Sequence, residues 1–155
     1  MSRNSMTALL LLAFGFWAGC NSRQDWESQT YPTSGTVSIN GEAPKDLFVI
    51  FLPTEGDVDS RGSMPWGVVQ EDGSYQMRTY DICDGAPAGE YAVLLRWPFD
   101  RAAPGDRLRS AFSTVDKSPL TYTVQAGKNQ LPPIELTGVK VTPLKKSKPF
   151  AMGSE

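Results

Sequence analysis

Carboxylates are the side chains of this chain best suited to chemistry. Two acidic groups placed across a bond can share acid and base work, as in glycoside hydrolysis. Six carboxylates lie in or near predicted turns: Asp57, Asp59, Asp72, Asp81, Asp84 and Glu90. An aspartate in a turn usually hydrogen-bonds its own backbone. We therefore expect structural roles for these groups, and a carboxylate-dependent hydrolase remains an alternative.

The sequence contains no histidine. Histidine is the usual general base near neutral pH and a common metal ligand, so hydrolases built on a histidine base are excluded. Walker and dinucleotide-binding glycine patterns are absent too. Asp81 and Asp84 offer hard oxygen ligands for Ca²⁺, but their spacing lacks the regular alternation of a calcium loop. We expect a protein that is not an enzyme and that needs neither cofactor nor metal.

Two tryptophans and one cysteine are the other residues of interest. Trp66 and Trp97 would stack on sugar rings if they were exposed, so they are the candidate ligand contacts. An aromatic residue in a strand more often packs in the core. Cys83 has no histidine to lower its pKa, and we expect it to be a small buried apolar residue rather than a nucleophile.

The N-terminus has the order of an export signal. Arg3 precedes an apolar run over residues 8–17, and Ala18-Gly19-Cys20 follows. The run is about half the roughly 20 residues that a membrane-spanning helix needs. Residues 1–19 are therefore predicted to be a signal peptide that is removed.

The cleavage point resembles the lipobox of bacterial lipoproteins, in which the cysteine is lipidated and becomes the new N-terminus. This resemblance makes Cys20 the site of lipidation. Trp17 departs from the pattern, which usually has Leu, Val or Ile there. An ordinary secreted protein or a retained signal anchor are the alternatives. Two acyl chains hold a protein stably at a membrane, so the expected location is the cell envelope, outside the cytoplasm.

The charge of the mature chain argues against nucleic acid as a partner. Loss of residues 1–19 removes Arg3 and leaves 14 Lys and Arg against 17 Asp and Glu, a net charge of −3. Nucleic-acid binders usually carry a basic face. The basic cluster of this chain lies in residues 138–155, with Lys140, Lys145, Lys146 and Lys148. We expect that segment to be a disordered basic tail.

One folded domain is predicted between a leader, residues 20–32, and this tail. Over residues 33–137 apolar residues recur at every second position between turn signals, which is typical of strands with one buried face. The predicted strands cover residues 37–40, 47–52, 66–70, 74–80, 91–97, 120–124 and 131–136. The last two are expected to form a pair joined through residues 125–129. About seven short strands without helices indicate an all-β fold, a single antiparallel sandwich.

Two connections stand out within the domain. Glu71-Asp72-Gly73 is a strong hairpin signal between residues 66–70 and 74–80, because glycine accepts the positive φ of a tight turn. Residues 98–119 form a longer connection that carries Arg101, Arg107 and Arg109. A loop of this length is either a packed connector or a binding loop. Leu108 and Phe112 are spaced to place one helical turn on the sandwich edge.

Several segments together resemble a family of small planctomycete envelope lipoproteins. They are residues 31–37, Asn40-Gly41, residues 51–53, 72–75, 79–80, 84–91, 118–120 and 124–127. The resemblance implies a carboxypeptidase regulatory-like, or transthyretin-like, Ig-like sandwich. The enzymes that share this fold depend on histidines, so their activities do not carry over, and a fold alone licenses no reaction.

The sequence leaves three hypotheses. The first is a non-enzymatic, lipid-anchored structural or interaction module, bound to the membrane through its N-terminal lipid and facing envelope proteins or polysaccharide. The second is a carbohydrate-binding accessory protein that uses Trp66, Trp97 and the long loop. The third is the carboxylate-dependent hydrolase.

Overall fold

The computed structural model of the chain describes residues 23–100 and 105–144. Seven strands of three or more residues fall where the sequence pattern predicts strands. They are β2 (Thr33–Ile39), β3 (Phe48–Pro53), β4 (Trp66–Val68), β5 (Ser74–Gln76), β7 (Gly89–Arg96), β8 (Thr121–Val124) and β10 (Ile134–Leu136). Three two-residue strands add to them: β1 (Thr30–Tyr31), β6 (Ala86–Pro87) and β9 (Asn129–Gln130). One 3₁₀ turn, η1 (Val115–Lys117), precedes β8.

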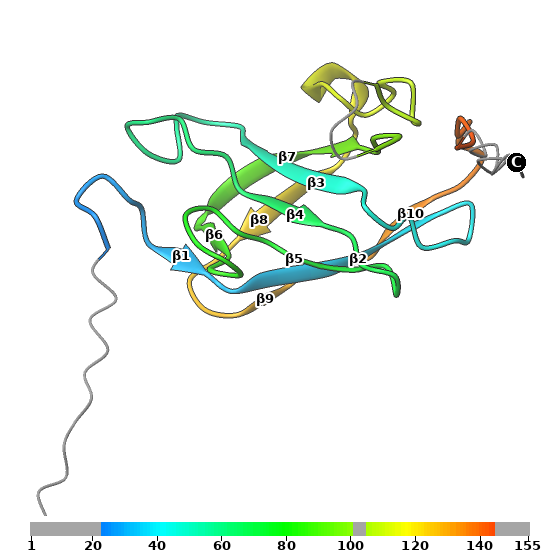
Figure 1. Ribbon diagram of the computed structural model, residues 1–155. Helices are drawn as coiled ribbons and strands as arrows, with labels where there is room; N and C mark the ends of the chain where they lie inside the picture. Colours follow the sequence, from blue (N-terminus) through cyan, green and yellow to red (C-terminus); the bar gives the residue numbers. More distant parts are fainter. Residues whose placement is uncertain (1–22, 101–104, 145–155) are drawn as a thin grey trace, which may run out of the picture.

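The strands form two layers that face each other (Figure 1). One sheet has the order β4-β3-β7-β8, and all of its pairs are antiparallel. The other has the order β10-β2-β5, with β9 also paired to β2. The short pair β1-β6 closes the end of the sandwich near the N-terminus. The all-β sandwich is thus confirmed.

The core lies between the two sheets and is built from alternate residues of each strand. Val37 and Ile39 of β2 are buried, and on the facing sheet Val49 and Phe51 of β3 are fully buried. In β7 the inward stripe consists of Tyr91, Val93 and Leu95. Side chains at every second position point to one face of a strand, so this burial confirms the predicted inward faces of β2 and β7.

The predicted hairpin around Gly73 forms only at its ends. Gln70 donates its N–H to the Ser74 carbonyl, and Trp66 and Arg78 exchange two backbone hydrogen bonds. Between these points β4 joins β3 and β5 joins β2, so the two arms belong to opposite sheets. The turn is correctly predicted, but the two arms are not the neighbouring strands of one sheet.

The last two strands are also arranged differently from the expectation. They were expected to form a pair joined through residues 125–129. Instead β8 pairs with β7, whereas β10 crosses to the other sheet and runs parallel to β2. The short β9 is parallel to β2 as well. The sandwich is therefore antiparallel in most but not all of its pairs.

The described part of the long connection, residues 98–100 and 105–119, packs on the sandwich. Leu108 is 1% exposed and belongs to the core, and Phe112 packs against that core. The Asp106 carboxylate accepts N–H bonds from Trp97, Leu108 and Ser110 at 2.9–3.0 Å. These contacts favour the packed connector over a free binding loop.

Contacts of the folded domain extend past both expected boundaries. Before residue 33, Ser28 donates its N–H to the Tyr80 hydroxyl, and β1 pairs with β6. After residue 137, Asn40 exchanges two hydrogen bonds with the Val139 backbone. Thr142 donates its N–H to the Arg107 carbonyl. The leader is therefore in part a structural element of the sandwich.

Candidate functional site

Most of the candidate carboxylates hold turns together, as their positions predicted. Asp84 accepts the N–H groups of Thr79 and Tyr80 at 2.7 and 3.0 Å. Asp72 accepts the N–H and the hydroxyl of Ser74. Asp81 accepts the N–H of Ile82 at 2.6 Å. A carboxylate whose oxygens accept hydrogen bonds from the backbone fixes the loop in place.

Asp84 gives a direct test of this structural role. Asp84→Ala leaves the N–H groups of Thr79 and Tyr80 without their acceptor, which costs about 1–3 kcal/mol. We expect a lower free energy of unfolding in urea. Asp57→Ala, at an exposed carboxylate, is the matched control and should change stability by less than about 0.5 kcal/mol. Equal stability of the two variants would contradict the structural role.

Asp59 differs from the other aspartates because it is buried, at 8% exposed. Its carboxylate accepts N–H groups from Arg61 at 2.7 Å and Ser63 at 3.2 Å. Burial by itself would raise the pKa of Asp59, but the interactions with Ser63, Arg61 and Tyr80 outweigh it and lower the pKa to about 2. The folded state therefore favours the charged form of this group.

This shift predicts a pH dependence of stability. Because the folded pKa of Asp59 lies below the ordinary value of 3.8, its contribution is present above about pH 4 and is lost as the pH falls toward 2. Asp59→Asn should be less stable than the unsubstituted chain by about 1–2 kcal/mol at neutral pH. That difference should shrink between pH 4 and pH 2. A difference that stays constant over this range, measured by urea unfolding, would contradict the assignment.

Asp57 and Glu90 lie on a shared polar cleft of about 540 Å³, together with Glu55, Tyr31 and Tyr91. No motif in the sequence marks Glu55 as a candidate. Among residues 23–100 and 105–144, no group of three His, Cys, Asp or Glu side chains converges to hold a metal ion. The cleft is an acidic hollow at the N-terminal end of the sandwich.

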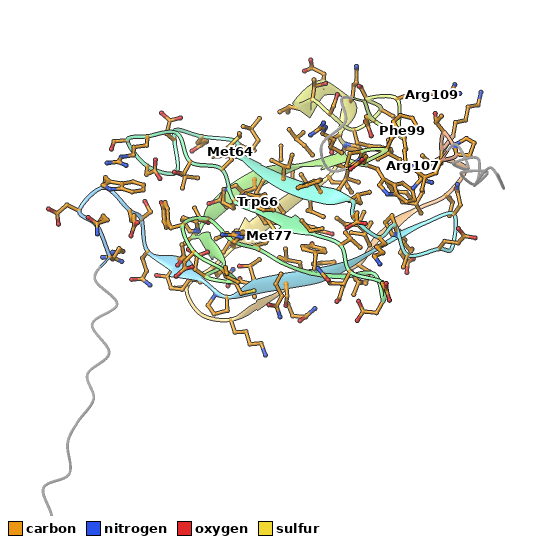
Figure 2. All side chains as sticks on the ribbon, in the orientation of Figure 1. Met64, Trp66, Met77, Phe99, Arg107 and Arg109 are labelled. Carbon is orange, nitrogen blue, oxygen red and sulfur yellow. The ribbon has the colours of Figure 1, made fainter. Side chains whose placement is uncertain are left out.

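Both the ring and the indole N–H of Trp97 contact other residues of the protein. Its indole N–H donates to the Lys45 carbonyl at 2.9 Å. The Arg107 guanidinium carbon lies 3.7 Å from the centre of the ring, and Arg107 also donates to the Thr142 carbonyl. Figure 2 labels Arg107, Phe99 and Arg109 at the upper right of the domain. One face of this ring is therefore covered.

Trp66 lies elsewhere, on β4. Its ring centre is 5.9 Å from that of Phe48 and 5.0 Å from the Arg78 guanidinium carbon. It lines an apolar hollow of about 460 Å³ beside Arg78 and Ile82, whereas Trp97 lines another hollow of about 410 Å³. Both tryptophans are half-buried. The structure does not bring the two candidate ligand contacts into one groove.

Cys83 is exposed, so the expectation of a buried residue is wrong. It lies in the turn between Tyr80 and Gly85 with a positive φ of 57°. Its neighbour Ile82 is 74% exposed. An apolar residue type suggested burial, but the backbone of this turn directs both side chains to the surface.

The proposed lipidation site, Cys20, lies outside the described residues, as do Arg101 and the lysines at 145, 146 and 148. Lys140 is described and is exposed. In the described part of the chain, no helix has the length and apolar character needed to cross a bilayer.

The N-terminal end of the domain brings three segments together. It consists of residues 23–31, the loop 54–64 and the turn 80–85. Trp26 meets the Tyr80 ring edge-on at a centroid distance of 5.4 Å, and the Arg61 guanidinium carbon lies 3.9 Å from the Trp26 ring centre. Ser28 also donates its hydroxyl to the Val58 carbonyl at 2.5 Å. No motif in the sequence marks this cluster, because its members are far apart in the chain.

A comparison of this chain with protein-family models, curated proteins and solved structures found no match.

Proposed function

We propose that the protein is a non-enzymatic, lipid-anchored module of the bacterial cell envelope. The sequence Ala18-Gly19-Cys20 after an apolar run supports lipidation at Cys20. The observation that carries the proposal is the position of that cysteine relative to the fold. Six residues after Cys20, Trp26 packs on Tyr80, so the anchor precedes the ordered domain by a very short tether.

The hydrogen bonds of the aspartates support the proposal that the protein is not a catalyst. Asp72, Asp81 and Asp84 each accept hydrogen bonds from neighbouring backbone N–H groups, as loop-forming aspartates do. The chain has no histidine. We infer that the sandwich acts by presenting its surface to envelope proteins or polysaccharide. Its two-sheet arrangement is compatible with the proposed carboxypeptidase regulatory-like domain.

Metabolic labelling with an alkyne analogue of palmitate tests the anchor. The cells should incorporate the label into the unsubstituted protein, because the diacylated cysteine would carry it. Cys83→Ala should keep the label, since Cys83 is the matched exposed thiol of the domain. Label that is lost from Cys83→Ala, or that never appears in the unsubstituted protein, would contradict lipidation at Cys20.

The carbohydrate-binding alternative has less support. A sugar ring stacks on a free aromatic face, whereas Trp97 is covered on one face by Arg107. Trp66 is partly packed against Phe48 and stands in a separate hollow. Calorimetric titration with envelope polysaccharide tests this alternative. Binding that Trp66→Ala abolishes would restore it in place of a general interaction module.

A further inference from the structure

We propose that the N-terminal end of the domain docks on the membrane surface and receives a zwitterionic phospholipid headgroup. The docking surface consists of Arg23, Trp26, Arg61 and Ile82. This inference rests on the proposed function, because the lipid on Cys20 is what brings this end to the bilayer. Beyond the anchor, it specifies which end of the domain faces the membrane and which class of lipid headgroup that end contacts.

The length of the tether places this end at the bilayer. Trp26 follows Cys20 by six positions, and an extended chain spans at most about 3.6 Å per residue, or about 20 Å in all. Trp26 and Ser28 are fixed to the turn at Tyr80 and the loop at Val58. The tether therefore cannot carry the docking surface far from the headgroups, and the acyl chains hold it at a high effective concentration there.

The side chains of this surface suit an interfacial environment. Ile82 is 74% exposed, the most exposed of the large apolar side chains in residues 23–100 and 105–144. Trp26 is half-buried against Tyr80 and carries the Arg61 guanidinium over its ring. Indole rings and long cationic side chains are favoured at the headgroup level because one part is apolar and the other is wet. An apolar side chain that tips into the interface removes its surface from water.

The charges at this end select a zwitterionic headgroup. A polar hollow of about 840 Å³ opens beside Ile82, and it is lined by Arg23, Glu27, Asp81 and Asp84. A guanidinium recognises a phosphate, and carboxylates attract an ammonium group. Phosphatidylethanolamine carries both charges in one headgroup. Phosphatidylglycerol has a net negative charge and no ammonium group, so the carboxylates repel it and its presence should weaken docking.

A vesicle experiment separates docking from acylation. The chain from residue 21 onward is tethered by an N-terminal hexahistidine to nickel-chelating lipid, and Cys83, its single thiol, carries a fluorescent dye. Spin-labelled headgroups quench a dye that reaches the surface. Quenching should be strong on phosphatidylethanolamine and phosphatidylcholine vesicles and weaker when phosphatidylglycerol replaces part of the lipid. The same dye at residue 115, in Val115→Cys with Cys83→Ser, reports on η1, which is not part of the docking surface.

Substitutions make the test decisive. Ile82→Glu should lower the ratio of docked to undocked protein by about tenfold, equivalent to about 1.4 kcal/mol. Val115→Glu is the matched control, because Val115 is 49% exposed at the start of η1, and it should leave docking unchanged. Circular dichroism verifies that both variants are folded. Quenching of the Cys83 dye that is unaffected by Ile82→Glu, or that is strongest on anionic vesicles, would overturn the docking proposal. Failure of palmitate labelling with docking intact would overturn the natural anchor alone.

Discussion

Cys20→Ala is expected to move the protein from the membrane fraction to the soluble fraction. Each methylene group of an acyl chain that is buried in the bilayer contributes about 0.8 kcal/mol, so two chains bind almost irreversibly. Without them, the remaining contacts are the few side chains of the docking surface. We expect nearly complete release after cell fractionation, detected by immunoblotting of pellet and supernatant.

Cys83→Ala is the control for this prediction, because it removes the other cysteine and leaves the proposed anchor intact. It should stay with the membranes. High salt distinguishes a lipid anchor from electrostatic attachment, since salt screens surface charges but does not extract acyl chains. Retention of Cys20→Ala in the pellet would contradict the anchor and favour an uncleaved apolar segment.

Val93→Asp is expected to unfold the domain. Val93 is fully buried in β7, where it pairs with Phe51 of β3, and its carbonyl accepts the Ser118 hydroxyl. An unpaired carboxylate at this position costs about 4 kcal/mol or more, compared with roughly 5–15 kcal/mol of stability for a typical domain. Thermal melting followed by near-ultraviolet circular dichroism should show the loss of the native transition.

Arg96→Asp places the same side chain at an exposed position of the same strand. The domain should then melt within a few degrees of the unsubstituted protein, because a surface substitution usually changes stability by less than about 0.5 kcal/mol. Val93→Asp that melts like Arg96→Asp would mean that the inward face of β7 is assigned wrongly.

The strands could be predicted because the alternation of apolar and polar residues within each strand indicates which of its faces is buried. In β7, Tyr91, Val93 and Leu95 alternate with residues of the other face, and the structure buries all three. The alternation is local, so it needs no knowledge of the partner strand. The turn at Gly73 is likewise local, since its positive φ of 83° is a property of one residue.

Pairing between strands was predicted less well, because it depends on residues that are far apart. β10 lies parallel to β2 although about a hundred residues separate them. Neighbouring strands in the sequence often pair, and that tendency suggested hairpins for β4 with β5 and for β8 with β10. The two members of each pair instead lie in opposite sheets.

In the candidate site, too, local features could be predicted and contacts between distant segments could not. Turn chemistry correctly assigned backbone roles to Asp72 and Asp84. Residue type alone failed for Cys83, since exposure follows from the path of the 80–85 turn. The cluster of Trp26, Arg61 and Tyr80 joins three distant segments, and no motif in the sequence marks it.

Intact-mass spectrometry of the mature protein, extracted from its native membranes, is the most direct test of the anchored sandwich. The predicted result is a chain that begins at Cys20 and carries the added mass of a diacylglycerol group on that residue. A chain that begins at any other residue, or that has no acyl mass, would contradict the account.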